Sequence, residues 1–253
     1  MIDAHAHLQD ESFTEDVNEV LERAFSSGIT HIACIGYDLP SSREALVMAA
    51  ANPRILAVAG IHPHEAGTYT EADLTELYSL AKNPLVKAVG EIGFDYYYDK
   101  DYKTEQESLL RAQIKIAREV NKPIIIHDRD AHQDIFRIIQ EEKAGLNGGI
   151  MHCYSGSAVM AMDFIRAGFY ISLAGPLTFK NAKKTVEVAA RVDLTHLLVE
   201  TDCPYLTPEP YRGRRNEPLR VWEVAAKLAA VKEIELQAVE AATDSNCHQI
   251  FGI

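Results

Sequence analysis

The chain has 253 residues, of which 47% are apolar and 25% are charged, a composition typical of a folded globular protein with little disorder. The formal net charge of −12 at pH 7 argues against the broad basic face of nonspecific nucleic-acid binders, so an anionic substrate must be held locally. No run approaches the ~18 apolar residues of a membrane span, and the first residues lack the basic and apolar regions of a signal peptide. We therefore expect a cytoplasmic protein without membrane contact, and no stretch indicates an obligate protein partner.

Short apolar runs alternate along the chain with longer segments of helical spacing, which is the pattern of repeated βα units. Eight runs, which we predict to be strands, lie at residues 2–8, 31–37, 55–62, 86–94, 123–128, 148–154, 169–175 and 196–201. Eight strands and a length near 250 residues favour an α/β fold of the (β/α)8 TIM barrel type over an open, doubly wound sheet. No linker or repeat supports a second domain, so we predict a single domain over residues 1–253.

Three helices are predicted from apolar residues at three- and four-residue intervals, over residues 104–120, 217–232 and about 234–250. Thr104 followed by Glu107 predicts a capping box at the start of the first. Asn216 before Pro218 predicts an N-cap with proline in the first turn of the second.

Candidate metal ligands occur where the predicted strands end: His5, His7, Glu91, His127, His152 and Asp202. The carboxyl ends of barrel strands form one face, so we expect these six side chains to converge there. His5 and His7 are two residues apart and should point to the same side of their strand. Imidazoles and carboxylates together bind several divalent metals, and a carboxylate such as Glu91 can bridge two of them. We predict two divalent cations, with Mg, Mn and Zn as candidates.

Histidines at strand ends can also have a purely structural role. A single histidine in such a place is more often held by structural hydrogen bonds than by a metal, but six candidate ligands in this order make a purely structural role a weak hypothesis. The cysteines are widely spaced and form no CxxC pair, which disfavours both a disulfide framework and a thiolate zinc site.

Six blocks of sequence carry a resemblance to a known family: DAHAHL at 3–8, GIHPHEA at 60–66, VGEIGFDYY at 89–97, PIIIHDRDA at 123–131, HCYSGS at 152–157 and ETDCPYLTPEPYRGRRNEP at 200–218. They resemble the TatD-type metal-dependent deoxyribonucleases, which belong to the amidohydrolase-like metallohydrolase barrels. The resemblance spans nearly the whole chain. It implies that His5, His7, Glu91 and Asp202 hold one cation and that Glu91, His127 and His152 hold the other.

Two positions depart from the pattern of that family. Phe94 stands where leucine is usual, and Asp128 follows His127 where serine or asparagine is commoner. If the strand continues, Asp128 points away from His127, so we expect it to affect packing or specificity rather than metal binding.

The predicted activity is hydrolysis of phosphodiester bonds, with a hydroxide that bridges the two cations as nucleophile. Asp202 and Glu91 are the predicted catalytic residues, and Asp202 is the candidate base because a carboxylate beside the water can accept its proton. The predicted substrate contacts are His62, His64, Arg129 and Arg214, and Tyr96, Tyr97 and Tyr98 are an aromatic run able to stack bases.

The resemblance implies a DNase, acting as a 3′ exonuclease on single-stranded DNA. The alternative is a metallohydrolase of carboxyl esters or amides, such as a lactone, cyclic amide or aminoacyl ester, since the same nucleophile can attack carbonyl carbon. Related barrels that cleave C–N bonds often use a carboxylated lysine where this chain has Glu91, which favours phosphate esters. A noncatalytic metal-binding scaffold is the third and weakest possibility.

Overall fold

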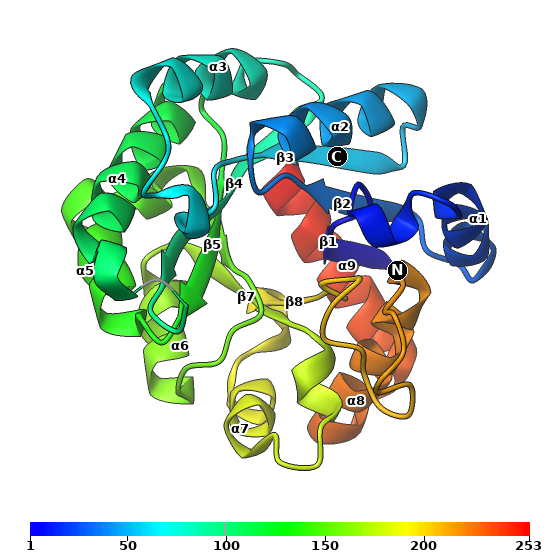
Figure 1. The fold of residues 1–253 in the computed structure, drawn as a ribbon. Coiled ribbons are helices and arrows are strands. Elements are labelled where there is room, and N and C mark those ends of the chain that lie inside the picture. Colours follow the sequence, from blue (N-terminus) through cyan, green and yellow to red (C-terminus); the bar gives the residue numbers. More distant parts are fainter. Residues whose placement is uncertain (99) are drawn as a thin grey trace. The chain divides into compact units, whose positions relative to one another are not determined.

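The computed structural model describes residues 1–98 and 100–253. Within them, strands and helices alternate along the chain (Figure 1). The strands are β1 Ile2–Ala6, β2 His31–Ile35, β3 Ile55–Ala59, β4 Val86–Asp95, β5 Ile124–Arg129, β6 Gly149–Met151, β7 Phe169–Leu173 and β8 Leu197–Val199. The α-helices are α1 Val17–Ser26, α2 Leu39–Ala51, α3 Glu71–Ala81, α4 Lys103–Glu119, α5 His132–Glu142, α6 Ala158–Arg166, α7 Lys183–Arg191, α8 Val221–Lys232 and α9 Leu236–Phe251.

The eight strands belong to one sheet and follow one another in the order β1 to β8. Each strand pair whose register is defined is parallel. This order, with a helix after each strand, is that of a (β/α)8 barrel, so the predicted fold class is confirmed. All eight predicted strands exist, although most are shorter than the apolar runs that predicted them.

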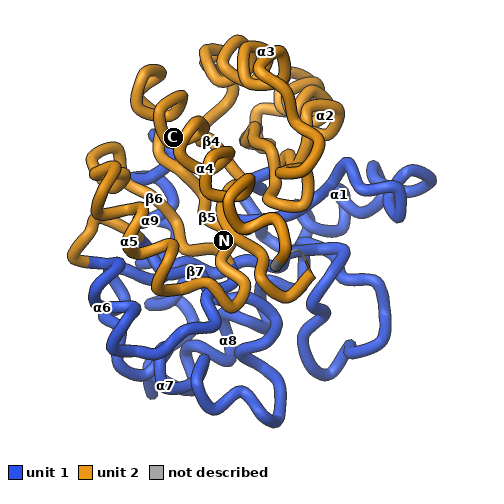
Figure 2. Tube along the Cα trace, turned by 60° about the vertical axis from the view of Figure 1, so that its left-hand side comes forward, with its two compact units in different colours: residues 1–34, 153–165, 170–253 blue, residues 35–152, 166–169 orange. Residues whose placement is uncertain are grey.

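The chain forms two compact units (Figure 2). Unit 1 comprises residues 1–34, 153–165 and 170–253, and unit 2 comprises residues 35–152 and 166–169. The single domain over residues 1–253 stays a prediction.

In unit 1, β7 pairs with β8, and Ala6 at the end of β1 forms a bridge with Cys203 after β8. Helix α9 packs against both β1 and β8. The amino terminus is fixed there, because the Met1 ammonium lies 3.1 Å from Glu240 and from Asp244. The ion pairs of Met1 thus anchor the first residues of β1, and the Ala6–Cys203 bridge holds the last residue of β1 beside the segment that follows β8.

In unit 2, the strands β3 to β6 pair in sequence, and their apolar side chains are buried, as expected for parallel strands covered on both faces. Strand β4 is the longest, and its register with β5 pairs Gly93 with His127 and Asp95 with Arg129. Gly93 has φ +152°, and a Cβ there would come within 1.9 Å of the His127 carbonyl oxygen. Only glycine therefore allows β4 to lie this close to the end of β5.

Two predicted helix starts are wrong. Helix α4 already begins at Lys103 after a 3-10 turn, so Thr104 lies inside the helix and cannot be its N-cap. Helix α8 begins only at Val221, because residues 218–220 form a 3-10 helix. The buried Asn216 side chain instead donates to the carbonyl oxygens of Thr201 and Tyr205 at 2.9 and 2.8 Å.

Among the described residues, no helix has the length and apolar character that crossing a membrane requires.

Candidate metal centre

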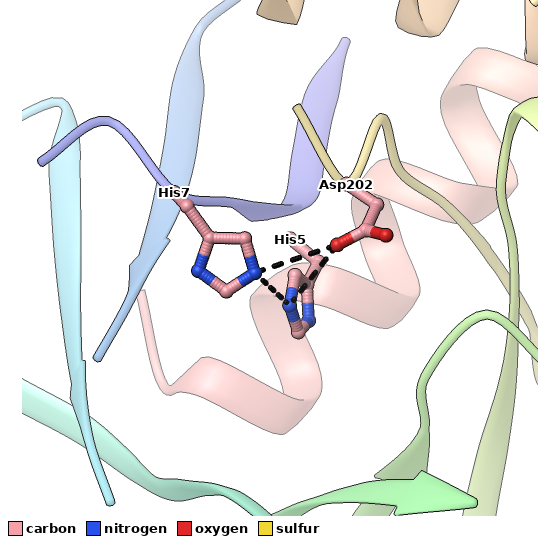
Figure 3. Close-up of side chains that lie close together, drawn as sticks. All are labelled: His5, His7 and Asp202. Carbon is pink, nitrogen blue, oxygen red and sulfur yellow. Dashed lines mark hydrogen bonds and ion pairs between the residues drawn. The ribbon is translucent and has the colours of Figure 1, made fainter. Parts of the chain in front are cut away.

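Unit 1 brings His5, His7 and Asp202 together (Figure 3). The Nε2 atoms of the two histidines are 3.3 Å apart. The Asp202 Oδ1 lies 3.7 Å from Nε2 of His5 and 3.4 Å from Nε2 of His7. All three residues are almost completely buried in the protein, so their donor atoms converge on a point shielded from bulk water.

Backbone hydrogen bonds fix this triad. The Asp202 N–H donates to the His5 carbonyl at 2.9 Å, and the His7 N–H donates to the Cys203 carbonyl at 2.8 Å. The buried carboxylate of Asp3 accepts from the backbone and hydroxyl of Thr201 at 2.9 and 2.6 Å. Asp202 has φ +56°, a left-handed conformation that aspartate tolerates better than most residues. The strand end therefore holds the triad in place before any ligand binds.

Unit 2 contains a second group around Glu91, which is 3% exposed. The Glu91 Oε1 lies 2.6 Å from Nδ1 of His127, 3.6 Å from Nε2 of His152 and 4.0 Å from Nε2 of His62. One carboxylate oxygen thus lies among three imidazoles from β5, the end of β6 and the loop after β3.

A second carboxylate, Asp95, lies beside this group. Its Oδ2 is 3.1 Å from Nε2 of His127 and 3.3 Å from Nε2 of His64. Burial opposes ionisation of Asp95, but the hydrogen bond from His127 and the backbone N–H of Tyr98 outweigh it and lower its pKa well below the usual range. Asp95 is therefore an anion, and its contacts fix the orientation of the His127 and His64 rings.

The charges of unit 2 favour a cation near His127. Burial alone would lower the pKa of His127, but Glu91 and Asp95 raise it to about 9. The pKa of His62 is instead lowered well below its usual value, mainly by burial and by the neighbouring His127. The carboxylates thus stabilise positive charge at one imidazole, while His62 keeps a neutral ring whose lone pair can bind a metal.

The donor sets fit divalent metals. Two groups, His5–His7–Asp202 in unit 1 and His62–Glu91–His127 in unit 2, each place three donor atoms within 4.8 Å of one another. Mixed imidazole and carboxylate ligands are the chemistry of zinc, manganese and related ions. Each unit can therefore contribute ligands for a cation from its own residues.

A model of the TatD related DNase family matches residues 2–252. The chain belongs to this family. An uncharacterized metal-dependent hydrolase of Bacillus subtilis, YabD, is 44% identical over 253 residues, covering all of this chain and 99% of its own. A 3′-5′ ssDNA/RNA exonuclease, TatD of Klebsiella pneumoniae, is 31% identical and covers all of this chain and 98% of its own.

A solved structure gives the same assignment. The TatD homologue YjjV of Escherichia coli K12 superposes with a TM-score of 0.95 at 28% identity, covering 100% of this chain and 98% of that one. The chain is thus a metal-dependent hydrolase of the TatD family, and the predicted membership of this family is confirmed.

The predicted ligands lie as two sets in the TatD-family chain. His5, His7 and Asp202 meet in unit 1, and Glu91, His127 and His152 meet in unit 2. His62, predicted only as a substrate contact, lies in the metal-ligand group of Glu91 and His127. Their roles as ligands stay predictions.

The remaining predicted substrate contacts are more exposed. His64 contacts Asp95 and has 43% of its side chain exposed. Arg129 and Arg214 are both exposed, whereas the neighbouring Arg215 is paired with Asp16 at 2.6 Å. Asp128, the departure from the family pattern, lies 2.7 Å from Nδ1 of His132.

Sequence reasoning missed three residues of unit 2. Asp95 lies four residues after Glu91 on the same strand and hence on the same side, a spacing that could have revealed it. Gln106 and Gln113 lie two turns apart on α4, and both are fully buried. Gln106 exchanges two hydrogen bonds with the backbone of Asp95, and Gln113 does the same with Ile61. One helix therefore fixes the backbone beside both His62 and the Asp95 carboxylate.

Proposed function

We propose that this TatD-family hydrolase cleaves phosphodiester bonds and removes nucleotides from the 3′ end of single-stranded DNA. The observation that carries the proposal is the Glu91 carboxylate lying against three imidazoles. A permanent carboxylate there, in place of a carboxylated lysine, favours phosphate over C–N substrates. The activity named for the Klebsiella pneumoniae relative supports the same choice.

The proposed ligands of the two divalent cations are His5, His7 and Asp202 for one and Glu91, His127 and His152 for the other. His62 is a further candidate for the second set. Glu91 as a ligand shared by both ions stays a prediction. When bound, such cations lower the pKa of water and neutralise charge on phosphate oxygens.

The side chains of this chain then have separate tasks. Asp202 Oδ2 accepts the proton of the attacking water, while Oδ1 faces His5 and His7. Asp95 holds the rings of His127 and His64, and the partly exposed His64 is a proposed contact for a phosphate oxygen. Arg129 and Arg214 are exposed cations that can pair with phosphate.

The deciding experiment presents metal-loaded protein with single-stranded DNA labelled at either end, a lactone panel and an aminoacyl ester. We expect stepwise shortening from the 3′ end, and loss of that activity in His7→Ala and Glu91→Gln. Cleavage of the carbonyl substrates alone would establish the rival metallohydrolase function. Internal cleavage of DNA would leave the phosphodiesterase but remove the exonuclease assignment.

A further inference from the structure

Two large aromatic side chains lie exposed directly after β4. Tyr97 is 60% exposed and Tyr98 is 69% exposed, and their rings meet edge to face with centroids 4.7 Å apart. Burying an aromatic ring is worth several kcal/mol, so side chains of this size are usually covered in a folded protein. Neither ring is needed for the core, which leaves a surface role to explain.

The two tyrosines are held beside the candidate metal centre of unit 2. The backbone N–H groups of Tyr97 and Tyr98 both donate to Oδ1 of Asp95 at 2.9 Å. The other oxygen of that carboxylate contacts His127 and His64. One buried side chain thus fixes the tyrosine turn and the histidines together.

The preceding residue anchors the same turn from the other side. The Tyr96 N–H donates to the Arg129 carbonyl at 2.9 Å, and its hydroxyl donates to Asp134 at 2.9 Å. Tyr96 therefore serves as the structural residue of the run, while the next two rings remain accessible.

A cation lies against this aromatic pair. The guanidinium of Arg129 lies 4.9 Å from the centroid of the Tyr97 ring. Within residues 1–98 and 100–253, no carboxylate lies within ion-pair distance of Arg129, whereas Arg111, Arg137 and Arg215 are each paired with acidic side chains. The Arg129 charge is therefore available to a ligand.

We propose that Tyr97, Tyr98 and Arg129 form a stacking site for an unpaired nucleobase, with Arg129 available to the adjoining phosphate. The proposal rests on the proposed nuclease function and specifies how its substrate is held. Every base has a π-face, so such a site accepts single strands without regard to sequence. The Tyr98 ring contacts His64 edge to face with centroids 5.6 Å apart. A base stacked on Tyr98 would therefore lie next to His64.

The negative net charge of the chain makes base stacking more important for the affinity for nucleic acid than contacts to phosphates. A net charge of −12 at pH 7 argues against strong binding through counterion release, which depends on many cationic contacts to phosphates. Stacking is much less sensitive to salt than phosphate contacts are. Binding through this site should therefore weaken only slightly with ionic strength.

The test measures binding of fluorescent tetrathymidylate, tetrauridylate and an abasic tetranucleotide to the full chain in chelator, where hydrolysis cannot interfere. We expect the wild type to bind both base-containing oligomers at least about fivefold more tightly than the abasic one. The double substitution Tyr97→Ala with Tyr98→Ala should remove that preference. The Phe pair should retain it, because the aromatic faces remain.

Tyr78→Ala provides the matched control, since Tyr78 on α3 also has a cation, Lys82, over its ring at 5.4 Å. It should leave the preference unchanged, and circular dichroism would verify folding of each variant. Equal binding of base-containing and abasic oligomers by the wild type, including no measurable binding of either, would overturn the stacking site. So would a preference that survives in the double Ala variant.

Failure of the proposed function would look different. A metal-loaded wild type that cleaves no phosphodiester, yet binds bases through Tyr97 and Tyr98, would refute the nuclease but retain the site. An active nuclease whose KM for single-stranded DNA is unchanged in the double Ala variant would refute the site alone.

Discussion

Replacing Gln113 by leucine tests whether α4 positions the loop that carries His62. The side-chain amide of Gln113 accepts from the Ile61 N–H and donates to the Ile61 carbonyl, both at 2.8 Å. Both Gln113 and Ile61 are buried. Leucine has a similar size but no polar atoms, so both backbone groups of Ile61 would lose their partner without gaining water.

The magnitude follows from those two groups. A buried polar group left unpaired costs about 1–3 kcal/mol, so the pair costs about 2–6 kcal/mol. The extra apolar surface buried by leucine offsets about 1 kcal/mol of this. We expect Gln113→Leu to lower the free energy of unfolding by about 1–5 kcal/mol, a large part of the ~5–15 kcal/mol of a typical protein.

Urea unfolding followed by circular dichroism in chelator measures this loss without a contribution from metal binding. Gln140→Leu is the control, because Gln140 is an exposed residue of the neighbouring helix α5, and surface substitutions usually change stability by less than about 0.5 kcal/mol. A Gln113→Leu protein as stable as the Gln140→Leu control would refute the assigned role of the glutamine.

Three further predictions concern the site and the charge of the chain. Asparagine adopts the left-handed backbone conformation of Asp202 as readily as aspartate does, so the Asp202→Asn protein should fold. Its turnover of a phosphodiester should nevertheless fall at least about 100-fold, because the amide cannot accept the proton of water. An Asp202→Asn protein that is metal-loaded and active would show that Asp202 is not the base. The Asp128 carboxylate contacts His132 and the Ala131 N–H. The Asp128→Ser protein should therefore retain bound metal, whereas the His127→Ala protein should lose it, and metal analysis of both proteins measures the difference. Equal loss of metal in the two proteins would place Asp128 among the ligands. Burial and the neighbouring Lys87 lower the pKa of Lys122 from 10.5 to about 8, so the unfolded chain binds more protons than the folded protein between these pH values. The free energy of unfolding of the wild type should therefore rise from pH 8 to 10.5 relative to that of Lys122→Met. A difference between the two proteins that does not change over this pH range would contradict the shift.

The strand ends of this fold were predictable because their chemistry is local. Two histidines separated by one residue on a strand share a side whatever the rest of the chain does, and His5 and His7 indeed meet. Asp202 was found in the same way, as a carboxylate just after the last apolar run. His5 and His7 lie beside Asp202 because the parallel bridge between Ala6 and Cys203 brings the ends of β1 and β8 together.

The supporting residues were not predictable, because their partners lie far away in sequence. Gln113 contacts Ile61, 52 residues earlier, and a glutamine on a helix gives no sign that it is buried. The predicted start of α4 was wrong for a local reason. The 3-10 turn before the helix already supplies helical backbone, so α4 begins without a side-chain cap. His62 was assigned to substrate because a loop histidine after a strand does not reveal its distance to Glu91.

The metal content of the purified, reloaded protein tests the central claim most directly. We expect two equivalents of divalent metal per chain, and about one equivalent in the His5→Ala, His7→Ala double variant, which leaves the ligands of unit 2 intact. A wild-type protein that binds less than one equivalent, or a double variant that binds as much as the wild type, would contradict a centre built from these histidines and carboxylates.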